Sequence, residues 1–223
     1  PVVAAPPANT GEALERVGEY LVDEQLLEGP NAGAWPFETD YTGSIVAGLV
    51  RAYMEWCDPV YKEAAMLGGE FIHQETDVEP EGYYGLGDEA YAVALLSEIS
   101  DDPADNIWRT RLGQFYAFIA AGEDGTAGFI SYYLTGAEPS TAVLYLAYHT
   151  VAAYYVDAAD KQVWRDALRD YLSRVDDDAA KWPVMALGIA TWAFAETGSL
   201  DLTPVDTGGD GSGIHAGTGR WGG

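Results

Sequence analysis

Positive charge is scarce in this sequence. The chain has 11 Lys and Arg residues against 36 Asp and Glu, which gives a formal net charge of -25 at pH 7. A surface of this sign repels phosphate backbones and anionic lipid, so nucleic acid is not an expected partner. Only Lys62, Lys161 and Lys181 are lysines. Many acids with few lysines are typical of halophilic proteins, and ordinary solubility is the alternative explanation.

Cysteines and long apolar runs are also lacking. Cys57 is the one cysteine, which excludes an internal disulfide. No apolar run is long enough to cross a membrane. Residues 142–156 come closest, but His149 and the flanking acids Glu138 and Asp157 favour a buried core helix. With 48% hydrophobic residues in 223, the chain is long and apolar enough for one domain with its own core.

Three regions differ in composition. Residues 1–9 are rich in Pro and Ala and predict an extended leader without the charged and apolar parts of a signal peptide. We therefore expect a mature secreted or cell-surface protein, with an excised domain as the alternative. Residues 10–198 form the expected folded domain. Residues 199–223 are rich in Gly and Asp and predict a tail or surface loop.

Helical segments separated by Gly and Pro fill the folded region. The expected helices span residues 10–27, 41–56, 58–74, 87–99, 104–121, 139–156, 158–175 and 182–197.

These segments alternate in type. Residues 41–56, 87–99, 139–156 and 182–197 are apolar on nearly every side, whereas the segments between them are apolar on one side. A helix that is apolar all round is buried, and a one-sided helix lies outside it. The buried type recurs every 43 to 52 residues or so, as in helical-hairpin repeats. The pattern predicts an all-α fold: an α/α toroid or partial toroid of about four hairpins, with a stacked solenoid as the alternative.

One segment carries a family resemblance. Tyr20-Leu21, then Gln25, then Gly33-Ala34-Trp35 resemble the QW repeat of the terpenoid cyclase and protein prenyltransferase toroids. The resemblance implies that an outer helix is tied to the turn before an inner helix. It extends to the similar scaffold of toroid polysaccharide lyases and glycoside hydrolases. The cyclase Asp-x-Asp-Asp motif and the prenyltransferase zinc ligands are not present, so the resemblance implies a fold and not cyclase chemistry.

Aromatic and acidic residues recur where the chain leads into the predicted inner helices, and in a toroid these segments share one face. The aromatic residues are Trp35, Tyr41, Tyr83, Tyr84, Tyr132, Tyr133 and Trp182. The acids are Asp40, Asp88, Glu89 and Glu138. Aromatic rings stack on sugar faces, and two carboxylates can act as acid and base in glycoside hydrolysis. The alternative is that the acids only cap helices and the aromatics only pack.

His149 and the neighbouring tyrosines offer a second chemistry. A His–Tyr pair that faces an open cavity could abstract the proton in a uronate lyase reaction, and the alternative is a hydrogen-bonded core histidine. The sequence has no metal motif. Residues 206–212 have a loosely calcium-like oxygen spacing, so no cofactor is predicted apart from a weak calcium possibility.

The sequence as a whole predicts an extracytoplasmic carbohydrate-active domain that binds or cleaves a polysaccharide or oligosaccharide. Its predicted cleft is the aromatic-acidic face before the inner helices. One alternative is a non-catalytic binding or structural module, and a further one is a terpenoid-cyclase-like protein. The sequence predicts neither the substrate nor the oligomeric state.

Overall fold

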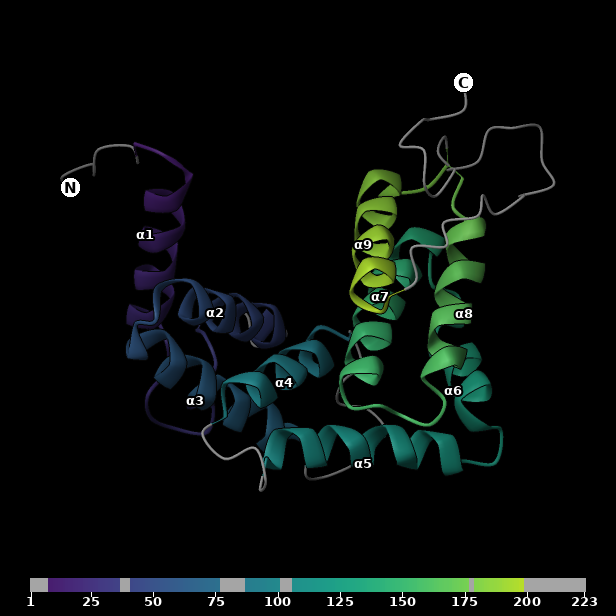
Figure 1. Ribbon diagram of the computed structural model, residues 1–223, viewed down its shortest axis with the longest axis horizontal. Coiled ribbons are helices and arrows are strands. Elements are labelled where there is room, and N and C mark those ends of the chain that lie inside the picture. Colours follow the sequence, from purple (N-terminus) through teal and green to yellow (C-terminus); the bar gives the residue numbers. More distant parts are fainter. Residues whose placement is uncertain (1–7, 37–40, 77–86, 101–105, 177–178, 199–223) are drawn as a thin grey trace.

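In the computed structural model of this chain, the structure describes residues 8–36, 41–76, 87–100, 106–176 and 179–198. These parts contain nine α-helices and no β-strand (Figure 1), which confirms the all-α prediction. The helices are α1 (Thr10–Asp23), α2 (Thr42–Trp56), α3 (Pro59–Thr76), α4 (Asp88–Ile99), α5 (Ile107–Ala121), α6 (Gly125–Tyr133), α7 (Pro139–Tyr155), α8 (Lys161–Ser173) and α9 (Pro183–Glu196). The predicted tail, residues 199–223, and residues 1–7 of the predicted leader lie outside the described residues.

Helix α6 was not predicted. Its glycines, Gly125 and Gly128, lower the helix propensity, so the sequence indicates a loop over this segment. The helix forms because tertiary packing outweighs propensity: Thr126 and Ile130 are buried against the rest of the fold, and Phe129 packs on Trp164 of α8.

Capping groups fix several helix starts. The side chains of Asn9, Asn106 and Glu138 each accept a hydrogen bond from a backbone N–H in the first turn of α1, α5 and α7. Such bonds satisfy N–H groups that have no partner within the helix. Pro139 and Pro183 lie in the first turns of α7 and α9, where the missing N–H costs nothing.

The helices pack in two layers. One row is formed by α2, α4, α7 and α9, each in contact with the next. Behind it, α3 packs on α2 and α4, α5 on α4 and α7, and α8 on α7 and α9. In Figure 1 helices α1 to α3 lie at one end of the molecule and α8 and α9 at the other. Since α2 and α9 do not pack on each other, the row has two ends. We call α2, α4, α7 and α9 the inner row, after the helices that the sequence predicts as inner.

A buried polar clamp holds α1 to this scaffold. The Gln25 amide Nε2 donates to the carbonyl oxygens of Gly33 at 2.8 Å and Ala64 at 2.9 Å. The Trp35 indole Nε1 donates to the Leu21 carbonyl at 2.6 Å. The end of α1, the turn before α2 and the middle of α3 are therefore fixed together by the residues that carry the QW-like pattern.

Two glycines of α2 give a matched test of this packing. A Cβ on Gly43 would lie 2.6 Å from the backbone nitrogen of Glu89, whereas a Cβ on Gly48 would meet nothing within 4 Å. We expect Gly43→Ala to destabilise the fold by about 1–3 kcal/mol because α2 and α4 must separate. Gly48→Ala should stabilise it by about 0.5–1 kcal/mol through helix propensity. Urea unfolding of both variants measures the difference, and equal effects would contradict the close α2–α4 contact.

Candidate functional site

Three aromatic rings from three helices of the inner row contact one another. Tyr91 of α4 lies 5.6 Å from Tyr148 of α7 and 5.0 Å from Trp192 of α9, measured between ring centroids. Tyr148 and Trp192 are 5.8 Å apart. Such edge-on and tilted pairs are favourable and hold the rings in place. Tyr91 is buried, and the other two rings are half-buried. We call these three residues the aromatic triad.

A cation adjoins the triad on the side of α2. Arg51 Nη2 donates to the Tyr91 hydroxyl at 2.8 Å. Desolvation acts to lower the pKa of Arg51, but the Tyr91 hydroxyl, Tyr155 and the Glu196 carboxylate raise it above its usual value. Glu196 lies in the last turn of α9, so an exposed cation and an exposed acid both lie near the rings.

A buried acid lies about one helical turn before Tyr91 in α4. Asp88 opens α4, three residues before Tyr91, and is 4% exposed. Its Oδ2 accepts from the Ser44 hydroxyl at 2.7 Å, whereas its Oδ1 has no hydrogen-bond partner among the described residues. Burial raises the pKa of Asp88, and the Ser44 hydrogen bond opposes that rise. Burial of the phenol raises the pKa of Tyr148, and the nearby Asp88 charge raises it further.

Helices α7 and α9 begin side by side. The Glu138 carboxylate accepts from Ser140 Oγ, from the Thr141 backbone N–H at 3.1 Å and from the Lys181 backbone N–H at 3.4 Å. Ser140 Oγ accepts from the Trp182 backbone N–H at 3.0 Å. Burial acts to raise the pKa of Glu138, but these hydrogen bonds hold it below its usual value. Glu138 is therefore an ionised cap that joins the starts of two inner helices.

The structure brings some of the predicted site residues together in pairs of helix starts. The Ser44–Asp88 bond joins the starts of α2 and α4, as Ser140 joins those of α7 and α9. Tyr133 lies near Asp88 and Glu89, whose charges add to the effect of burial in raising the Tyr133 pKa. Among the predicted aromatic residues, Tyr41, Tyr132 and Trp182 are exposed. Asp40, Tyr83 and Tyr84 lie outside the described residues.

Two predicted residues lie away from any open surface. Trp35 is 0% exposed and donates to Leu21, so its ring has no free face for a sugar. His149 is 1% exposed, and its ring stacks on Trp164 of α8 at 4.7 Å. Its Nδ1 lies 3.1 Å from the Tyr116 hydroxyl of α5. The structure therefore places His149 between the inner row and the outer helices, and not in the open cavity that the lyase hypothesis requires.

The sequence pattern alone does not single out the aromatic triad. Tyr91 and Trp192 lie in segments that are apolar all round, where any aromatic residue is interpreted as core. The available signal is chemical: Tyr91 and Tyr148 carry hydroxyl groups, and Arg51 carries a charge, in largely apolar helices. Polar-tipped residues in such helices face each other or an opening.

Comparisons with protein-family models, curated proteins and solved structures find no match to this chain. Within the described ranges, no helix is long and apolar enough to span a bilayer. The same ranges hold no group of three or more His, Cys, Asp or Glu side chains that could ligate a metal ion.

The buried Asp88 carboxyl makes stability depend on pH. Because its pKa is raised in the fold, the folded chain holds this proton more tightly than the unfolded chain. Its contribution to stability is present below the unfolded pKa of about 3.9 and is lost as pH rises through the folded value. We expect Asp88→Asn to abolish that loss while the amide still accepts from Ser44. Thermal unfolding from pH 3 to 8 compares the two proteins, and parallel curves would contradict a raised pKa.

Proposed function

We propose that this chain is an extracytoplasmic domain that binds a polysaccharide without cleaving it, through the aromatic triad. The observation that carries the proposal is the contact of Tyr91, Tyr148 and Trp192 beside Arg51 and Glu196. Ring faces suit the C–H faces of sugars. The guanidinium and the carboxylate supply the few polar groups that orient a ligand in a mostly apolar site. The net charge of -25 favours a neutral glycan over an anionic one.

The positions of the acids favour binding over catalysis. Glu138 serves as a helix cap, and Asp88 hydrogen-bonds to Ser44 at the start of α4. Hydrolysis requires two carboxyl groups that face each other across the scissile bond, whereas both of these carboxyl groups are engaged in hydrogen bonds at helix starts. His149 is enclosed by aromatic rings, as described above, so no described histidine serves the triad as a lyase base.

A hydrolase is the second candidate, and Asp88 favours it. A buried carboxyl with a raised pKa and an unpartnered oxygen has the properties of a general acid. Glu89 follows it in the sequence and is half-buried. In this version of the proposal Asp88 protonates the leaving glycosidic oxygen at the same face of the inner row.

We further propose that the two layers are a partial α/α toroid. The row α2, α4, α7 and α9 with an outer layer behind it supports that arrangement. The Gln25 and Trp35 hydrogen bonds, at the positions of the QW-like pattern, support it as well. In this arrangement the triad lies on the side of the row that faces the axis.

The experiment is a binding and turnover panel with defined oligosaccharides. Cellohexaose, xylohexaose, mannohexaose and hexagalacturonate are titrated by calorimetry at low and molar salt, and each mixture is then assayed for new reducing ends and for the absorbance of unsaturated uronates. We expect saturable binding of at least one neutral hexaose without products. Reducing ends that disappear in Asp88→Asn would favour the hydrolase. No binding to any oligosaccharide would contradict both versions.

A further inference from the structure

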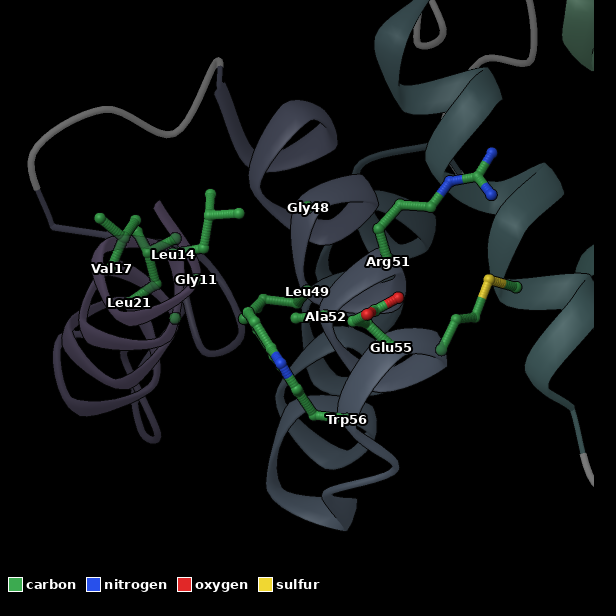
Figure 2. Close-up of a pocket in the computed structure, with 12 residues that line it drawn as sticks. Gly11, Leu14, Val17, Leu21, Gly48, Leu49, Arg51, Ala52, Glu55 and Trp56 are labelled. Atoms are coloured by element: carbon green, nitrogen blue, oxygen red, sulfur yellow. The ribbon is translucent and has the colours of Figure 1, made fainter. Parts of the chain in front are cut away.

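A groove of about 660 Å³ lies between α1 and α2, and Figure 2 shows the residues that line it. Each wall carries an apolar stripe of three residues at positions i, i+3 and i+7. The stripes are Leu14, Val17 and Leu21 on α1, and Leu49, Ala52 and Trp56 on α2. Leu14 and Val17 are 56% and 54% exposed, so the α1 wall leaves large apolar side chains uncovered by the described chain.

The groove is also open beside Gly48 of α2. Gly48 lines it, and a Cβ at that position would meet nothing within 4 Å. Among the described helices, α1 packs only on α2 and α3. The groove is therefore bounded by two helices and has room for a third element between them.

The dimensions fit a helix as the occupant. A stripe from i to i+7 is about 10 Å long, or two helical turns. An amphipathic helix that lies in such a groove places its own apolar residues at the same i, i+3, i+7 spacing. The facing stripes of α1 and α2 match that spacing on both walls.

Charge determines which helix fits. Helix α1 carries Glu12, Glu15, Glu19 and Asp23, and its one cation, Arg16, is paired with Glu12. From α2 the groove is lined by one acid, Glu55, and one cation, Arg51. The acids of α1 flank its apolar stripe and do not line the groove. The chain's net charge of -25 repels a second copy of itself and an anionic membrane.

We propose that the α1–α2 groove binds a basic amphipathic helix of a partner protein. Its apolar stripe packs on the two walls, and its Lys and Arg side chains face Glu55 and the acids that flank the α1 stripe. The groove shares Arg51 with the proposed glycan site, but its apolar walls are separate from the aromatic triad, so the two proposals are tested separately.

Cys57 provides the probe. It is the single cysteine of the chain, it is exposed, and it follows Trp56 at the end of the groove. An environment-sensitive fluorophore on Cys57 reports binding of a synthetic peptide of Leu at i, i+3, i+7 and Lys elsewhere. One control peptide has the same composition in scrambled order, and another keeps the Leu stripe but carries Glu in place of Lys. Calorimetry with unlabelled protein repeats the ranking, at the lowest salt concentration at which the chain keeps its helical circular dichroism.

We expect the Leu/Lys peptide to bind at least 10-fold more tightly than either control. Gly48→Leu places a side chain in the open space beside Gly48 without a backbone clash and should weaken binding at least 10-fold. Gly113→Leu makes the same change in α5, where a Cβ also meets nothing within 4 Å, and should leave binding unchanged. Equal binding of the scrambled peptide, no binding of either Lys peptide, or no effect of Gly48→Leu would each overturn the proposal. Self-association of the chain that Gly48→Leu abolishes would assign the groove to a second copy and overturn it too.

Discussion

Replacing Trp35 with alanine is expected to lower the free energy of unfolding by about 3–5 kcal/mol. The indole is fully buried between α1, α2 and α3, where Val46 and Phe71 are also core residues. The substitution leaves a large cavity and also removes the bond from Nε1 to the Leu21 carbonyl. Urea unfolding followed by circular dichroism measures the loss.

Trp35→Phe separates the two contributions. It keeps most of the buried ring but removes the hydrogen bond, so about 1–3 kcal/mol should be lost. If both variants unfold at nearly the wild-type urea concentration, Trp35 does not fasten the turn before α2 to α1, and the packing described here would be contradicted.

Trp192→Ala is expected to weaken binding of the preferred neutral hexaose about 10- to 100-fold, as for an aromatic residue that dominates a binding surface. The reason is the loss of one stacking face and of the support that Trp192 gives to Tyr91 and Tyr148. Calorimetric titration gives the affinity, and thermal unfolding shows that the variant remains folded.

Trp182→Ala is the matched control. Trp182 lies just before α9 on the same helix–loop segment, but it is exposed and has its ring near Lys181 and away from the triad. Its replacement should leave the affinity within about 2-fold of wild type, since isolated exposed contacts contribute little to affinity. A large effect of Trp182→Ala with none from Trp192→Ala would move the site to the segments that precede the inner helices.

Much of the helix layout could be predicted because Pro and Gly mark its boundaries. Pro139 and Pro183 begin α7 and α9 close to where the sequence suggests. Among the all-round apolar segments, α4 and α7 are buried along most of their length because a helix with no polar face has to be covered. Helices α2 and α9 lie at the ends of the row and leave Met54, Val184 and Met185 exposed. The sequence does not predict α6 because its two glycines lower the helix propensity. The stability of this helix comes from tertiary contacts.

The site was harder to predict for a geometric reason. Trp35 looks like an exposed loop aromatic until its bond to Leu21 and its place under α3 are known, and neither follows from local spacing. His149 lies in an apolar helix whose pattern does not say which side faces the outer layer. The triad depends on three helices that meet through Tyr91, and side-chain direction within such helices is set by packing and not by periodicity.

The contact surface of a bound glycan tests the assignment of the aromatic triad most directly. The chain has seven tryptophans, and the indole N–H signals of a ¹⁵N-labelled sample, assigned with single Trp→Phe variants, report on each of them separately. On addition of the hexaose that binds most tightly, we predict that the Trp192 signal shifts while those of the buried Trp35, Trp108 and Trp164 do not. A Trp192 signal that stays fixed while the hexaose saturates the protein would contradict the assignment of the aromatic triad as the binding site.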